Sequence, residues 1–147
     1  MSRPVMPVAL LLSRKDLESI LKMGDAIETV ERAFKELSDG SVNMPVRQVI
    51  KDQSGTVGFM PAYLREMNAV GVKVVSLFSQ NPQKHNLPTT IAVVLLVNPE
   101  NGTLLAIMDG TYLTAMRTGA ASGVATKYLA KKDAAEIGVI GTGVQAR

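Results

Sequence analysis

Residues 136–147 read EIGVIGTGVQAR, and this stretch decides how the rest of the chain is interpreted. Ile137, Val139 and Ile140 form a short apolar run, which is typical of a buried parallel strand. In a dinucleotide-binding turn the first glycine allows a sharp bend, the second lets the backbone approach a pyrophosphate, and the last position must be small. The run leads directly into such a G-x-G-x-x-A turn, made of Gly141, Thr142, Gly143, Val144, Gln145 and Ala146, which we predict to bind a nucleotide cofactor.

The composition indicates a globular protein of about one domain. Of 147 residues, 46% are hydrophobic and 20% are charged, which separates the chain from disordered sequences. The net charge is only +3, and the basic residues are scattered, with no run longer than Lys131-Lys132. A nucleic-acid surface usually shows a clustered basic face, so we expect no nucleic-acid partner.

Cysteine and histidine usage excludes several kinds of site. The chain has no cysteine and one histidine, His85, which excludes disulfides, a thiol nucleophile and a multi-histidine metal centre within one chain, so no metal is predicted. The absence of cysteine fits a reducing cytoplasm, which is the expected localisation. The apolar run at residues 8–12 is too short to span a membrane and is expected to be a first buried strand.

Periodicity predicts helices first and strands afterwards. An S-x-x-D capping pattern at Ser13 and Asp16 opens a short helix that ends near Lys22, and a second helix covers residues 25–38 before Gly40. Short turns between the strands argue for an antiparallel or mixed sheet, and therefore for an α+β fold. The expected strands are residues 46–51, 56–60, 70–79, 89–97 and 103–108, with residues 60–63 closing a hairpin and residues 80–88 forming a polar loop.

A last helix is predicted from about Thr111 to Lys131, with Asp109 as its cap. Residues 118–125 of this helix are nearly all small, so something approaches its backbone closely. Either the helix packs tightly against the sheet or a cofactor lies there, and the residues alone do not choose. The helix leads into the terminal strand, so a domain boundary is expected near Arg117. The predicted domains are residues 1–117 and residues 118–147, of which the second contains the linking helix and the start of a Rossmann domain.

Three cations occur in apolar surroundings: Lys73 within VGVKVVSLF, Arg47 in the first arm of the hairpin, and Arg117 before the small residues. Each alone fits a solvated side chain on a half-exposed sheet. Together they suggest a site, because two guanidinium forks can bind a carboxylate bidentately. A partly buried lysine beside two arginines has a lowered pKa and can exchange a proton with a carbonyl or imine. Met60 either lines this pocket or packs in the core.

Further motifs point to a family. They follow one another along the chain, from Arg47 to the glycine turn. They are Met60-Pro61-Ala62-Tyr63-Leu64, Gly71-Val72-Lys73, Asn81-Pro82, Leu87-Pro88-Thr89, the turn at residues 98–102, and LTAMRTGAAS at residues 113–122. With these motifs the chain resembles the ornithine cyclodeaminase/mu-crystallin family from about Val8 onward.

The resemblance implies a two-domain, nicotinamide-dependent enzyme, with NAD or NADP as cofactor. It implies that Arg47 and Arg117 bind the substrate carboxylate, and that Lys73 assists proton transfer at the reacting carbonyl, imine or amine. Thr89 and Thr118 would approach the cofactor. The first domain of such proteins usually pairs with its twin in a homodimer, with the two sheets forming a closed barrel.

Two departures from the family pattern qualify this expectation. Members that cyclise ornithine typically carry a glutamate two residues before the methionine of the Met-Pro pair, where this chain has Gly58. Ornithine is therefore a less suitable substrate, and the MPAYL wording is closer to the alanine dehydrogenase-like branch. The catalytic aspartate of the family and most of its nucleotide-binding sheet are expected beyond Arg147.

The sequence thus predicts the N-terminal part of an oxidoreductase or deaminase acting on a small amino, imino or keto acid. Two alternatives remain open. One is a small-molecule binding protein of the mu-crystallin kind, in which turnover is marginal. The other is an inactive, truncated module that only dimerises.

Overall fold

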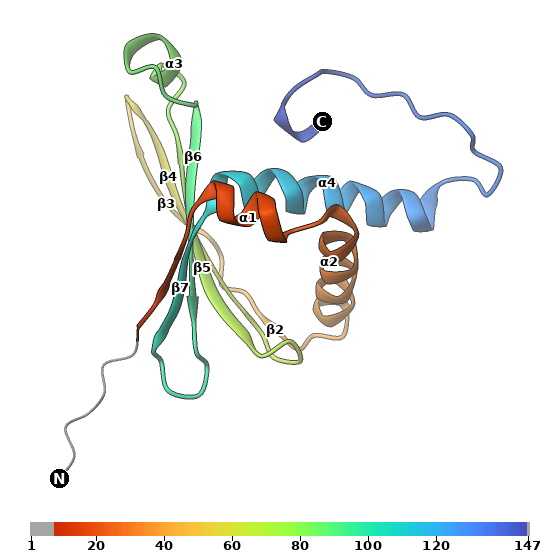
Figure 1. Cartoon of the computed structure of the whole chain (residues 1–147), viewed down its shortest axis with the longest axis horizontal. Helices are drawn as coiled ribbons and strands as arrows, with labels where there is room; N and C mark the ends of the chain where they lie inside the picture. The colour runs from red at the N-terminus through yellow and green to blue at the C-terminus, as the bar shows by residue number, and fades with distance from the viewer. Residues whose placement is uncertain (1–7, 147) are drawn as a thin grey trace.

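The computed structural model describes residues 8–146, which form one mixed, seven-stranded sheet with helices (Figure 1). The strand order is β1-β7-β6-β5-β4-β2, and β3 also pairs with β4. All pairings are antiparallel except β1 with β7, so the predicted α+β class with a mixed sheet is confirmed. The strands are β1 (Leu10–Leu12), β2 (Val42–Asn43), β3 (Gln48–Asp52), β4 (Gly55–Leu64), β5 (Ala69–Leu77), β6 (Thr90–Val97) and β7 (Leu104–Asp109).

The helices begin where the sequence provides caps. In α1 (Arg14–Ile20) the hydroxyl of Ser13 and the carboxylate of Asp16 form the predicted capping box. The amide of Tyr112 donates to Oδ1 of Asp109 at 2.6 Å, which opens α4 (Gly110–Leu129). The other elements are α2 (Met23–Ser38), the four-residue α3 (Asn81–Lys84) and a terminal 3-10 turn, η1 (Val144–Ala146).

Strand β4 is the longest and accommodates a proline without losing a cross-strand bond. On one edge β4 pairs with β3 as far as Phe59 and with β2 from Tyr63 onward. Pro61 lies in the gap between these two partners, where the missing amide hydrogen costs nothing. Residues 60–63 therefore continue β4, and the expectation that they close the hairpin is wrong.

Helix α4 starts in direct contact with the sheet and projects away from it (Figure 1). A Cβ atom on Gly110 would lie 2.8 Å from the backbone carbon of Ala92, so only glycine allows this approach. The amide of Ala92 also donates to the hydroxyl of Thr111 at 3.0 Å. These two contacts fix the base of α4 on β6, on the side of the sheet to which Ala92 points.

The small residues of α4 pack against α2 and not against the sheet. A Cβ atom on Gly119 would come within 3.3 Å of the Met23 methyl group, and one on Gly123 within 3.0 Å of Ile27. Ala120, between them, is completely buried. Of the two interpretations left open by the sequence, close packing accounts for these glycines, with a helix as the partner.

The side of the sheet opposite the helices is apolar, and no helix of residues 8–146 covers it (Figure 1). Residues opposite each other in the antiparallel register share a side, so Phe59, Val74 and Val93 lie in one row of it. We call this surface the open face. It is formed by Val57, Phe59, Pro61, Val72, Val74, Val93, Leu95 and Ile107, none of which is buried.

Little of the chain is buried. Its accessible surface is 11257 Å², whereas a folded monomer of 15.7 kDa exposes about 7,300 Å². The first strand illustrates the point, because β1 forms as predicted but Leu11 is 78% exposed, so the expectation of a buried strand is wrong. Among residues 8–146 no helix is long and apolar enough to cross a membrane.

Two further predictions need correction. Residues 80–88 are not entirely loop, because Pro82 falls in the first turn of α3, where its fixed φ favours a helix. Residues 137–140 form no strand, and Ile140 is fully exposed. A strand requires a neighbour to satisfy its backbone groups, and no described strand lies beside this segment. The predicted domain boundary near Arg117 lies within α4, the linking helix, and stays a prediction.

Candidate active site

Three of the predicted site residues lie in one row across the helix side of the sheet. In the register Lys73 of β5 is opposite Met60 of β4. Gln48 is opposite Phe59, so continuing this register by one residue places Arg47 opposite Met60. Lys73 is two residues from Val75, which is opposite Ala92 at the base of α4, so the row faces the helices. Arg47 itself precedes β3 and does not belong to the hairpin arm as predicted.

The environment lowers the pKa of Lys73 from its ordinary value near 10.5. The largest cause is burial, which disfavours the ammonium form, followed by the positive charges of Arg117 and then Arg47. Lys73 is half-buried, while both arginines are exposed. The structure thus confirms the expected direction of the shift and brings the three predicted cations into electrostatic contact.

Neither arginine is neutralised by the protein. Among residues 8–146, Arg47 and Arg117 have no carboxylate within 4.0 Å. Arg117 borders an apolar pocket of about 160 Å³ between α2 and α4. Its other lining residues are Leu21, Ala26, Thr29, Val30, Leu113 and Met116. An exposed guanidinium group beside an apolar pocket suits an anion with an aliphatic body.

A second cleft lies on another side of α4, next to the glycine turn. Its volume is about 400 Å³, and Thr89 lies in its wall together with Val144 and Gln145. The remaining lining residues are Arg14, Pro88, Thr90, Thr111, Tyr112, Thr114 and Ala115. The structure therefore brings one predicted threonine to the predicted turn, and it reveals Arg14, Tyr112 and Thr114, which sequence reasoning missed.

Other predicted cofactor contacts, Thr118 and two glycines of the turn, lie in different surroundings. The hydroxyl of Thr118 donates to the carbonyl of Thr114 within α4 at 2.7 Å, and Thr118 does not line the cleft. Gly141 has φ +96°, a conformation that L side chains rarely adopt, so the first glycine of the turn is required for its backbone. A Cβ atom on Gly143 would meet nothing within 4 Å in this structure.

A signal for the missed residues is present in the sequence. Thr111, Thr114 and Thr118 recur at helical spacing, which places a stripe of threonines along α4. The oxygen Oγ1 of Thr114 is buried without a hydrogen-bond partner among the described residues. A buried, unsatisfied hydroxyl in a cleft wall is costly unless a ligand or water completes it.

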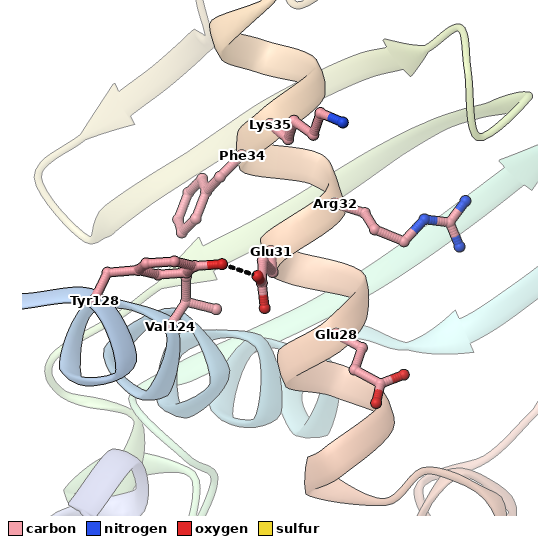
Figure 2. A pocket seen from close by; sticks show the side chains of 7 residues that line it. All are labelled: Glu28, Glu31, Arg32, Phe34, Lys35, Val124 and Tyr128. Atoms are coloured by element: carbon pink, nitrogen blue, oxygen red, sulfur yellow. Dashed lines mark hydrogen bonds between the residues drawn. The ribbon is translucent and has the colours of Figure 1, made fainter.

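A larger pocket, of about 620 Å³, lies elsewhere and contains none of the predicted site residues (Figure 2). It is a groove between α2 and the end of α4, where the Tyr128 hydroxyl donates to the Glu31 carboxylate. Lys127 Nζ also donates to Glu31 at 2.7 Å. Glu31, Lys127 and Tyr128 thus satisfy one another, and the groove is also lined by Glu28, Arg32 and Lys35.

The comparisons with known proteins agree with this geometry. The chain is 42% identical over 137 residues to an alanine dehydrogenase of Archaeoglobus fulgidus, covering 93% of this chain and 42% of the relative. A solved Delta(1)-pyrroline-2-carboxylate reductase of Thermococcus litoralis, in complex with NADH and L-proline, superposes with a TM-score of 0.87 at 53% identity, covering 93% of this chain and 43% of that one. A dimer of archaeal alanine dehydrogenase with bound NAD gives 0.89 at 42% identity, over 94% and 42% of the two chains.

The chain thus spans less than half the length of these relatives. The family model for the ornithine cyclodeaminase/mu-crystallin family matches residues 8–147. This match includes the cation row, the threonine-lined cleft and the glycine turn. The chain belongs to the ornithine cyclodeaminase/mu-crystallin family.

Proposed function

We propose that this chain is the substrate-binding and dimerisation part of a nicotinamide-dependent oxidoreductase or deaminase acting on a small amino, imino or keto acid. The observation that carries the proposal is the row of Arg47, Met60 and Lys73, with Arg117 acting on Lys73 from α4. Two unpaired arginines supply a carboxylate site, and a lysine with a lowered pKa supplies a proton donor and acceptor beside it.

The proposed chemistry follows from these charges. The substrate carboxylate binds Arg47 and Arg117 through paired N–H···O contacts, while Met60 borders its carbon body. Lys73 in its amine form accepts a proton from the substrate nitrogen or hydroxyl on oxidation, and as an ammonium returns it on reduction. Because the bound carboxylate offsets the positive charge of the arginines, substrate binding raises the pKa of Lys73 and favours proton uptake.

The cleft beside the glycine turn fits a nicotinamide cofactor. Thr89 lines it together with Val144 and Gln145 of the glycine turn, and the hydroxyl of Thr114, also in its wall, has no hydrogen-bond partner among the described residues. When bound, NAD or NADP supplies the hydride acceptor or donor. We keep Thr118 as a further cofactor contact, which requires its hydroxyl to exchange the Thr114 carbonyl for the ligand.

The open face suggests a homodimer. We also propose that the protein is cytoplasmic. Its apolar side chains and the excess accessible surface of about 4,000 Å² over a compact monomer call for covering by further protein. The archaeal alanine dehydrogenase to which the chain is similar is described as a dimer. We propose that two copies pack their open faces together, as in the barrel that the family resemblance implies.

The test is a turnover assay with the full-length protein and NADH or NADPH, using pyruvate plus ammonia and cyclic imines as substrates. We expect turnover in the wild type and a loss of at least about 100-fold in Lys73→Ala, with cofactor binding retained. Lys51→Ala, which removes an exposed lysine of β3, serves as the control. Wild-type turnover that survives Lys73→Ala would contradict the role of Lys73. Substrate binding without turnover in the wild type would favour a binding protein.

A further inference from the structure

Arg14 lies in the walls of two adjoining clefts that face the glycine turn. One is the 400 Å³ cleft described above, and the other, of about 260 Å³, shares Arg14, Tyr112, Val144 and Gln145 with it. Arg14 is the only cation lining either cleft among residues 8–146. A single positive charge therefore faces residues 144–145 from the substrate-binding part of the chain.

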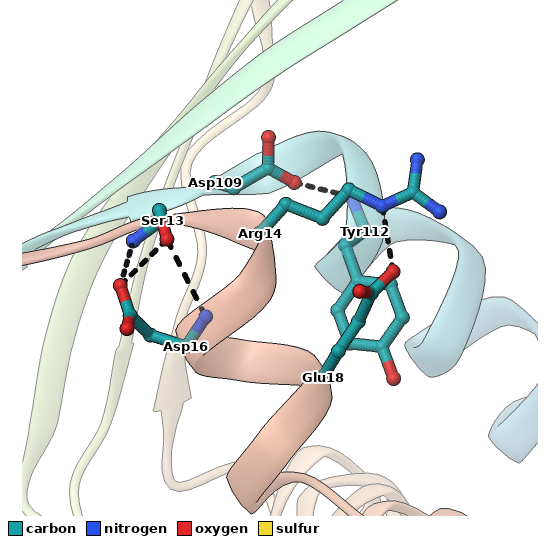
Figure 3. Close-up of polar contacts among 6 residues, drawn as sticks. All are labelled: Ser13, Arg14, Asp16, Glu18, Asp109 and Tyr112. Atoms are coloured by element: carbon teal, nitrogen blue, oxygen red, sulfur yellow. Dashed lines mark hydrogen bonds and ion pairs between the residues drawn. The ribbon is translucent and has the colours of Figure 1, made fainter.

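The side chain of Arg14 is held in place but keeps free donors (Figure 3). Its Nε donates to Oε1 of Glu18 at 2.7 Å, and its Cζ lies 6.0 Å from the ring centroid of Tyr112. Figure 3 shows the two terminal nitrogens pointing away from Glu18. Hydrogen bonding to Glu18 raises the pKa of Arg14, so its charge is permanent at any working pH.

The chemistry of the cleft matches a phosphate group. A guanidinium fork binds phosphate oxygens through parallel N–H donors. Val144 and Gln145 of the glycine turn line the same cleft, and the backbone amides of such a turn suit a pyrophosphate. Thr114 also lines the cleft, and its buried hydroxyl has no hydrogen-bond partner among the described residues. Arg14 and the turn thus offer donors to one cleft.

We propose that Arg14 is a cofactor-binding residue, which contacts the pyrophosphate of the dinucleotide in the cleft that the glycine turn also lines, with Glu18 and Tyr112 positioning its guanidinium group. This inference rests on the proposed function, because it requires a dinucleotide in the cleft. A residue of the substrate-binding part of the chain thus directly binds the negatively charged pyrophosphate of the cofactor.

The experiment measures dissociation constants of NADH, by its fluorescence, and of ADP-ribose, by competition, for the full-length protein. ADP-ribose keeps the pyrophosphate but lacks nicotinamide. We expect Arg14→Ala to weaken both ligands by about tenfold, as for loss of one hydrogen bond to a charged group. Arg14→Lys should recover part of the loss. Lys15→Ala removes the same charge from the next residue of α1, which does not line either cleft, and should change neither constant.

The outcomes separate this inference from the proposed function. Wild-type binding with an unchanged Arg14→Ala constant overturns the role of Arg14 and leaves the proposed function standing. A loss confined to NADH overturns the assignment to the pyrophosphate. A wild type that binds neither ligand overturns both proposals. Circular dichroism of Arg14→Ala, with the wild-type spectrum and melting temperature expected, excludes misfolding as the cause of a loss.

Discussion

Lys73 and Val74 are neighbours in β5, but they lie on opposite sides of the sheet and have different surroundings. On the helix side, Lys73 is half-buried among positive charges beneath α2 and α4. On the open face, Val74 lies in a row with Phe59 and Val93, and this row ends at Asp109, which caps α4. The comparison teaches that one strand of alternating side chains can present a reactive site and an association surface at once, because its period is two.

The largest effect is expected from charging the open face. Val93→Asp would place a carboxylate in the middle of the proposed dimer contact, where burying an unpaired charge costs several kcal/mol. We expect sedimentation analysis to show monomers at concentrations where the wild type is dimeric. Leu129→Asp, at the exposed end of α4, makes the same change outside this surface and should leave the dimer intact. A dimeric Val93→Asp variant would place the contact elsewhere.

A smaller effect, on the free energy of unfolding, is expected from removing the hydrogen bond that Glu36 of α2 accepts. Glu36 of α2 is 1% exposed, and its Oε1 accepts the amide of Glu66 at 2.8 Å in the turn between β4 and β5. Glu36→Ala leaves that amide unpaired, so urea denaturation should show a loss of about 1–3 kcal/mol in the free energy of unfolding. Glu36→Gln keeps an acceptor oxygen and should lose less. Equal losses in the two variants would argue against this hydrogen bond.

The next prediction concerns the field at Lys73. Arg117→Leu removes the neighbouring positive charge that has the larger effect on Lys73, so the pKa of Lys73 should rise. Arg47→Leu should raise it by a smaller amount, because its contribution is the lesser one. NMR titration of isotopically labelled lysine side chains measures both shifts directly. An unchanged titration in Arg117→Leu would mean that the charge of Arg117 does not contribute to the lowered pKa of Lys73.

The smallest effect is on stability as a function of pH. Because folding lowers the pKa of Lys73, the folded state binds fewer protons than the unfolded state between the lowered value and about 10.5. The free energy of unfolding therefore gains a contribution that rises with pH through this window. Lys73→Met removes it, so the variant should be relatively more stable below the window, and its advantage should shrink as pH rises. A constant stability difference between Lys73→Met and the wild type across this window would contradict the coupling.

Much of this arrangement could be predicted from local sequence. The capping box at Ser13, the cap at Asp109 and the alternation of β5 each depend on a few neighbouring residues, and each forms as expected. The lowered pKa of Lys73 followed from its apolar flanks and from two arginines expected nearby. Such features need only the right period and the right cap to be recognised.

What could not be predicted depends on partners distant in the chain. The run at residues 137–140 has the composition of a strand, but composition does not supply the neighbour that a strand requires. Arg14 follows Ser13 at the start of the first predicted helix, where nothing in the local sequence indicates a cleft. Arg14 reaches the cleft only because α1 packs beside Tyr112. The small residues of α4 were ambiguous for the same reason, since their partner, α2, lies about 90 residues earlier.

The contact of Gly110 with β6 fixes one end of α4 at the sheet, so a tilt of the helix would pivot at this contact. Arg117, at the proposed substrate site, and Thr114, at the proposed cofactor cleft, both lie on this helix. Arg117 lies about 10 Å from the pivot at 1.5 Å per residue, so a tilt of about 5° moves its backbone by about 1 Å. Displacements of that size can cost about 100-fold in rate. The alignment of the two proposed binding sites therefore depends on the base of α4, where Gly110 meets Ala92, and a methyl group at position 110 would shift both.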